Sequence, residues 1–366
     1  MPEVTRPNSA ARAAQREKTR SSHRPQERAD LALFAAALSA RLPGSWTATA
    51  REHAENSDQF PLRERLWGFG HARWALSEFV LQRDAVLTSD CGAELVVVDR
   101  PLRRHEFLVA ALAPQGINVT DAVKAPDGIV VSADPARAAS AVADRLLPQY
   151  EQAVHQARIE HLAESVAAGE RALAEWDAVS DSLCDADHWP LDDRYGLRQQ
   201  QRDAEMWAQF APFLDHGPAL LSHAEAALPL LDPPDRAAGR WPYRLRVLRD
   251  ALDGGARVQA DFQVVADALV PGHPRAKEVF DRAVVERNAE GWDCSLTWME
   301  NAGALVEMSR AEQALQRGSE GLKRSAQAKA ASARSPLAAR ESAAPVQESA
   351  SRPVDRRGHD RRPRLR

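Results

Sequence analysis

The pattern of apolar and polar residues changes character near residue 134. Before that point, short apolar runs rich in β-branched residues alternate with turn signals, as in "DAVLTSDCGAELVVVDRP". Two runs flanking "SDCG" predict a β-hairpin, with Gly92 at the turn position that requires a positive φ. "INVTDAVKAPDGIVVSAD" predicts a second hairpin around "APDG". The intervening segment 102–114 predicts a helix, with a strand as the alternative for its middle.

Helical spacing precedes these strands. Leu31, Phe34, Leu38 and Leu42 recur at intervals of three or four residues, which predicts a first helix near residues 30–42. A second helix begins at "SDQFP", where Ser or Asp serves as the cap and proline lies in the first turn.

The second predicted helix contains the stretch "WGFGHARW". A G-x-G-x-x-G phosphate loop would require glycine at position 73, which is arginine, and a preceding strand. On a helical wheel Gly70 lies between Trp67 and Trp74, so we expect it to permit the close approach of another backbone. Arg73 falls on the apolar face of this helix, where a salt bridge or an outward-turned side chain is expected to accommodate its charge.

The alternative for Arg73 is an anion-binding site. "DRPLRRHEF" (99–107) is the densest basic segment outside the chain ends, and guanidinium groups bind carboxylates and phosphates well. The candidate anion-binding residues are His71, Arg73, Arg100, Arg103, Arg104 and His105.

From Asp134 and Pro135, a typical helix start, helical periodicity dominates to about residue 316. Ile159, Leu162 and Trp176 belong to a helical stripe in which Gly169 fills the remaining seam position, and this predicts a long helix over 135–181. Its heptads are too few to establish a coiled coil. Further helices are predicted over 194–213, 217–231, 238–252, 256–270, 274–289 and 292–316. The fold class is therefore an α+β N-terminal unit (31–133) followed by a mainly α-helical domain (134–318).

Charge separates the chain ends from this core. Residues 1–30 contain 7 basic and 4 acidic side chains, and residues 319–366 contain 12 and 5, whereas the whole chain has a net charge of −4. The part between them is therefore strongly acidic. Both ends are rich in Ser, Ala, Pro, Gln and Arg, and such segments bury too little apolar surface to fold alone. We therefore predict disordered basic tails over 1–30 and 319–366.

The last residues, "RRGHDRRPRLR", are a candidate contact for nucleic acid or for an acidic partner. No aromatic residue lies among these arginines, so the stacking used by single-strand binders is missing. The residues concerned are Arg356, Arg357, Arg361, Arg362, Arg364 and Arg366.

Signals for chemistry are sparse. The sequence contains no P-loop, no G-x-S-x-G and no C-x-x-C motif. Its three cysteines are far apart, and this spacing favours a reducing, cytoplasmic location. "CDADHW" (184–189) lacks the spacing of a calcium or zinc site and is expected to be a capped loop between helices. His216 and His223 are expected near helix ends, where they would satisfy carbonyls. We expect no metal and no cofactor.

The sequence predicts a non-catalytic binding or scaffolding protein of the cytoplasm, with a protein partner and no membrane segment. One alternative is association with nucleic acid through the arginine-rich tails. The other is an enzyme or binder acting on an anionic small molecule near Arg73 and the 99–107 segment.

Overall fold

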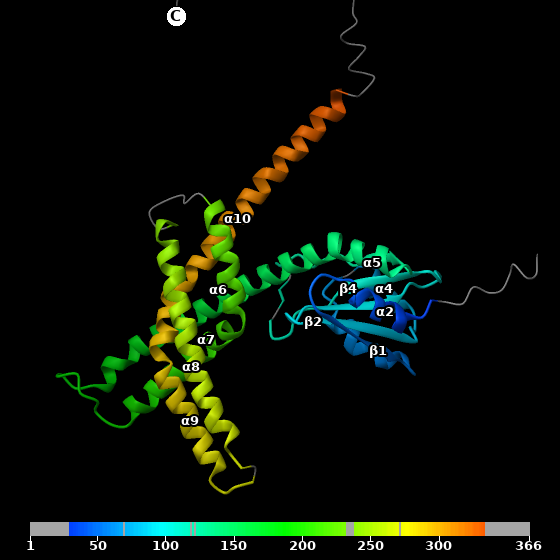
Figure 1. Cartoon of the computed structure of the whole chain (residues 1–366). Helices are drawn as coiled ribbons and strands as arrows, with labels where there is room; N and C mark the ends of the chain where they lie inside the picture. The colour runs from blue at the N-terminus through cyan, green and yellow to red at the C-terminus, as the bar shows by residue number, and fades with distance from the viewer. Residues whose placement is uncertain are drawn as a thin grey trace, which may run out of the picture. The chain divides into compact units, whose positions relative to one another are not determined.

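The computed structural model describes residues 29–333, apart from residues 69, 118, 121, 232–237 and 271. The chain divides into two compact units, residues 1–309 and residues 310–366. The first unit holds a sheet followed by a helical region, which confirms the predicted fold class (Figure 1). The described part of the second unit is the end of the last helix.

A five-stranded antiparallel sheet forms the N-terminal part of the first unit. Its strands pair in the order of the chain, so each strand hydrogen-bonds to the next. The Gly92 turn between the second and third strands has φ +80°, which confirms the predicted hairpin. The strands are β1 (Trp46–Glu52), β2 (Arg83–Ser89), β3 (Glu94–Asp99), β4 (Glu106–Ala111) and β5 (Ile129–Ser132).

Both faces of this sheet are buried at its central strands, β3 and β4. On one face, Leu95 and Val97 pack with α2 (Leu31–Ser39), α5 (Pro135–Ala141) and the beginning of the long helix that follows. On the other face, Val96 and Val98 pack with α3 (Phe60–Arg65) and α4 (His71–Glu78). Because successive side chains of a strand point to opposite faces, a strand covered on both sides is a continuous apolar run.

The helix favoured over 102–114 is wrong, and the alternative of a strand for its middle is confirmed, because β4 lies there. β4 is also the partner of β5, pairing Phe107 with Val131, so the second hairpin predicted around "APDG" is wrong as well. In "EFLVAA", every residue after the glutamate is apolar and buried. A short apolar run of this kind does not distinguish strand from helix by its periodicity.

The prediction of one helix from "SDQFP" onward is also wrong. A short 3₁₀ turn (Asn56–Gln59) leads into α3, the chain is extended at Leu66, and α4 then begins at His71. Gly70 is the N-cap of α4, and a Cβ added there would lie 3.8 Å from the Gly128 backbone nitrogen, an ordinary van der Waals distance. Another backbone comes closer at Gly68, where an added Cβ would lie 3.3 Å from the Pro126 carbonyl oxygen.

Long helices build the rest of the first unit. α5 continues through one π turn (Val142–Leu146) into α6, so the chain is helical from Pro135 to Ser180, as predicted. The long helices are α6 (Leu147–Ser180), α7 (Arg194–Ala227), α8 (Trp241–Asp267), α9 (Ala276–Glu290) and α10 (Trp292–Ala333). Three of them, α7, α8 and α10, are longer than predicted, whereas α9 agrees with the prediction to within two residues.

The breaks that were predicted inside two of these helices are thus absent. α7 runs through Pro212 and Pro218, and α8 runs through Gly254 and Gly255. α10 extends to Ala333, beyond its predicted end, so the predicted C-terminal tail begins within a helix. Within the described residues, no helix is both long enough and apolar enough to span a bilayer.

Candidate functional site

The six residues predicted for an anion site lie on the sheet side of the first unit. His71 and Arg73 belong to α4, and the other four lie between β3 and β4. Arg100 pairs with Glu106. Arg73 and Arg100 are half-buried, and the remaining four are exposed: His71, Arg103, Arg104 and His105. None of these six residues lines either of the two cavities described below, so this anion site stays a prediction.

The other sequence-based candidates have separate outcomes. The six tail arginines from Arg356 to Arg366 lie outside the described residues. The "CDADHW" segment is a capped loop, as expected, because the Asp185 carboxylate accepts from the backbone N–H groups of Asp187 and Trp189. His216 lies well inside α7 rather than near a helix end, so the capping role predicted for it is wrong.

A row of polar residues follows the interface between α6 and α7. On α6, His155, Arg158 and His161 recur every third residue, and residues three apart lie on neighbouring turns of one helix face. α7 contributes His216 and His223 to the same interface. The rings of His155 and His223 stack with their centroids 3.8 Å apart. We call these five residues the polar seam.

A cavity of about 450 Å³ opens at one end of the polar seam. Its walls are the loop Pro43–Trp46, the β2–β3 turn from Ser89 to Ala93, α6 from Leu147 to Arg158, and α7 from Ala219 to His223. This volume lies within the range of small-molecule sites, about 300–1,000 Å³. We call it the turn cavity.

Hydrogen bonds brace the wall of the turn cavity. The Ser89 hydroxyl accepts from the Ala93 backbone N–H at 2.8 Å, which fixes the tight turn around Gly92. The Asp90 N–H donates to the Ser45 carbonyl at 3.0 Å, tying this turn to the neighbouring loop. A wall held by backbone contacts is largely preformed, as is usual for ligand cavities.

Tyr150 joins α6 to the sheet beside the turn cavity. Its hydroxyl accepts from the Glu94 backbone N–H at 3.3 Å, and its ring meets Trp67 edge-on with centroids 5.8 Å apart. Burial raises the pKa of the Tyr150 hydroxyl above its ordinary value, and the hydrogen bond from Glu94 opposes that rise. The phenol is therefore neutral at physiological pH.

Arg158 is the cation of the turn cavity. Burial lowers the pKa of its guanidinium, while Tyr150 and Cys91 act in the opposite direction. Its Nε is buried and has no hydrogen-bond partner among the described residues. Because arginine stays protonated in proteins, Arg158 brings a positive charge to the cavity. The groups whose charge shifts the pKa of Arg158 are the Tyr150 phenol and the Cys91 thiol, and neither is a carboxylate.

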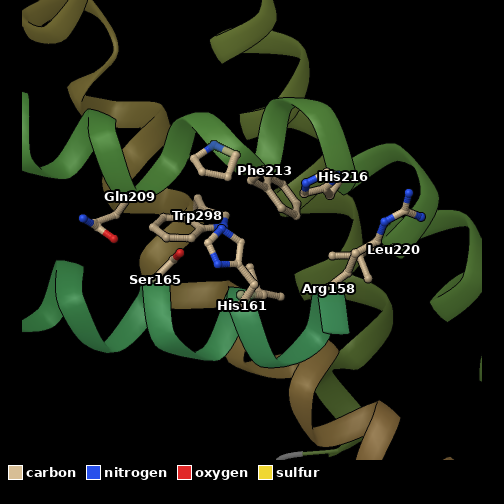
Figure 2. Close-up of a pocket in the computed structure, with 10 residues that line it drawn as sticks. Arg158, His161, Ser165, Gln209, Phe213, His216, Leu220 and Trp298 are labelled. Carbon is tan, nitrogen blue, oxygen red and sulfur yellow. The ribbon is translucent and has the colours of Figure 1, made fainter. Parts of the chain in front are cut away.

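A much smaller cavity, about 10 Å³, lies further along the polar seam. Figure 2 shows His161 and Trp298 at its centre, with Phe213 and His216 beside them and Arg158 at the end near Leu220. Trp298 comes from α10 and is fully buried. Burial is the main cause that lowers the pKa of His216, and the charge of Arg158 adds to it. We call this space the seam cavity.

Sequence reasoning missed the polar seam. The signal was present in "HQARIEH", in which histidine and arginine recur every three residues inside the long helix. The apolar residues Ile159 and Leu162 are interleaved with them and gave the stronger helical stripe.

Comparisons with known proteins identify no relative: no family model, curated protein or solved structure matches this chain.

Proposed function

We propose that this protein is a non-catalytic binding protein that takes a small organic anion into the turn cavity. The observation that carries the proposal is Arg158, a half-buried guanidinium whose Nε has no hydrogen-bond partner among the described residues. A buried guanidinium N–H without an acceptor is unfavourable, and a carboxylate or phosphate would supply both an acceptor and an opposite charge.

The rest of the lining supports a ligand with one anionic head and an apolar body. Pro43, Trp46 and Val154 give the cavity an apolar wall. Asp90 and Glu151 also line it, and both are exposed. These two carboxylates would repel a second anionic group at the cavity rim, so the charges favour a monoanion whose head reaches Arg158.

The test uses benzoate as a probe with one anionic head, and benzamide as its neutral counterpart. We expect benzoate binding to the full chain in isothermal titration calorimetry and a loss of about tenfold or more in Arg158→Gln, because a charge-assisted hydrogen bond contributes roughly 1.5–3 kcal/mol. Arg171→Gln is the matched control, since Arg171 is an exposed arginine of the same helix.

Two results would contradict this proposal. One is equal affinity for benzoate and benzamide, which would remove the role of the charge. The other is benzoate binding that Arg158→Gln and Arg171→Gln reduce by the same small factor, which would indicate general electrostatic attraction rather than a site.

The finer predictions about partner and location remain proposals. The cytoplasmic location is supported by Cys91, Cys184 and Cys294, which are all free thiols. The nucleic-acid alternative depends on tail arginines outside the described residues. It is tested by comparing the salt dependence of nucleic-acid binding by the full chain and by residues 31–318: equal, salt-insensitive binding would exclude it.

A further inference from the structure

Two histidines of the polar seam stack where α6 and α7 meet at the turn cavity. His155 lies on α6 and His223 on α7, and their ring centroids are 3.8 Å apart. A ligand nitrogen of one ring lies within 4.8 Å of a ligand nitrogen of the other. Both residues line the turn cavity. The pair therefore presents two imidazole nitrogens to one space, as two ligands of a metal ion do.

Charge limits what such a pair can hold. Two imidazolium rings at this distance repel each other, so at least one ring is neutral and carries a lone pair on a nitrogen. A transition-metal ion binds neutral imidazoles, and it would hold both rings without a second proton. In a tetrahedral zinc site, Zn–N distances of about 2.0–2.1 Å place two ligand nitrogens roughly 3.4 Å apart. Rotation of the exposed His223 side chain would close the remaining gap.

A carboxylate lies one helical turn from His155. Glu151 is four residues earlier on α6, and residues four apart share one helix face. Glu151 lines the same cavity and is exposed, so its side chain has room to turn toward the histidines. The same spacing of four residues pairs the two helical zinc ligands of the H-E-x-x-H motif. Two imidazoles and one carboxylate are also the donor set of zinc sites that keep a fourth position open.

The other charges of the turn cavity do not prevent cation binding. Arg158 lies one turn beyond His155 on α6, and its charge would repel a divalent cation. Asp90 and Glu151 act in the opposite direction, and these two carboxylates with one arginine give the lining a net formal charge of −1 when its histidines are neutral. The carboxylates therefore more than balance the arginine.

We propose that Glu151, His155 and His223 bind one Zn²⁺ ion at the turn cavity. Nitrogen and oxygen donors in a tetrahedral arrangement suit zinc, and three protein ligands leave the fourth position to water. This site would supersede the sequence-based expectation of no metal, which considered the Cys184–Trp189 segment. The proposal does not depend on the organic anion, because Arg158 is not a zinc ligand and zinc is titrated without benzoate.

The experiment uses the untagged full chain, stripped of metal with EDTA and then titrated with zinc chloride in isothermal titration calorimetry. We expect one saturable zinc site per chain. His223→Gln should weaken it by about a hundredfold, because even the outer-shell partners of metal ligands contribute roughly 10–100-fold. Glu151→Gln should weaken it by about tenfold or more. His71→Gln is the matched control, since His71 is an exposed histidine outside the cavity lining.

A crystal soaked in zinc provides the second measurement. We expect an anomalous peak at the zinc edge about 2.0–2.2 Å from nitrogen atoms of His155 and His223 and from a Glu151 oxygen. Three results would overturn the proposal: no saturable zinc uptake, an equal loss of affinity in His223→Gln and His71→Gln, or a zinc ion held by other residues in the crystal. Should a variant fail to fold in circular dichroism, the anomalous map of the wild-type protein decides the question alone.

Discussion

Gly255 is a position where one added methyl group should strongly disturb the helical region. It lies inside α8, and a Cβ built on it would be 2.3 Å from Phe210 Cε1 and 2.6 Å from Cζ. Phe210 is fully buried, and its ring is surrounded by Trp207, Phe213 and Trp298 at centroid distances of 5.6, 6.2 and 5.8 Å. The ring therefore has no free space into which it can move.

The size of the effect follows from two opposing contributions. Replacing a glycine inside a helix with alanine stabilises the helix by about 1 kcal/mol. Overpacking a rigid core by a methyl group costs about 1–3 kcal/mol, and contacts this short belong at the upper end of that range. We therefore expect Gly255→Ala to lower the free energy of unfolding by about 2 kcal/mol.

Gly303→Ala is the matched control, because Gly303 lies inside α10 with nothing within 4 Å of its added Cβ. That variant should be about 0.5–1 kcal/mol more stable than the wild type. Thermal unfolding followed by circular dichroism should then separate the two variants by roughly 10 °C, given a shift of about 2–4 °C per kcal/mol.

A second substitution tests the cause of the effect. Phe210→Leu shortens the side chain that collides with the new methyl group, so Gly255→Ala should be less harmful in that background. Additive effects of the two substitutions would mean that the clash is not with Phe210. Equal melting temperatures for Gly255→Ala and Gly303→Ala would refute the reasoning altogether.

Two further predictions concern the residues around the cavities. The pKa of His216 is lowered from an ordinary 6.5, so the unfolded chain binds this proton more readily, and stability should fall as the pH drops below about 6.5. His216→Gln should reduce that loss in urea titrations between pH 7 and pH 5, and parallel curves would contradict the assignment. Tyr150→Phe removes the acceptor of the Glu94 N–H and should cost about 1 kcal/mol. Tyr243→Phe, at a side chain that is 57% exposed, should cost almost nothing in the same thermal melts.

The sequence predicted an element correctly where contacts between neighbouring residues determine that element. The Gly92 turn was predicted because a tight hairpin requires positive φ there, and the observed φ is +80°. The helix from Pro135 to Ser180 was predicted from its cap and its apolar stripe; Asp134 accepts from the Ala136 and Arg137 N–H groups. These features depend on contacts within a few residues.

Tertiary contacts decided the elements that were predicted wrongly. The run "EFLVAA" becomes β4 because β3 and β5 pair with it on both sides. α7 remains one helix through Pro212 and Pro218, although proline removes a backbone hydrogen bond. Burial of Met206, Phe210 and Leu221 along that helix supplies the packing that offsets this loss. Propensity is a weak guide wherever such packing is strong.

The polar seam is the clearest case in which sequence alone is insufficient, because its meaning depends on which helix faces it. On an isolated α6, His155, Arg158 and His161 would be an ordinary solvated stripe. Placed against His216 and His223 of α7, they instead bury polar groups, and Arg158 Nε and His161 Nε2 have no hydrogen-bond partner among the described residues. Apolar side chains would pack there at less cost. Stability of the helix pair therefore does not explain these residues, whereas the organic anion that we propose at Arg158 would. Replacing Arg158 and His161 with apolar residues should therefore give a protein that is at least as stable as the wild type but no longer binds benzoate.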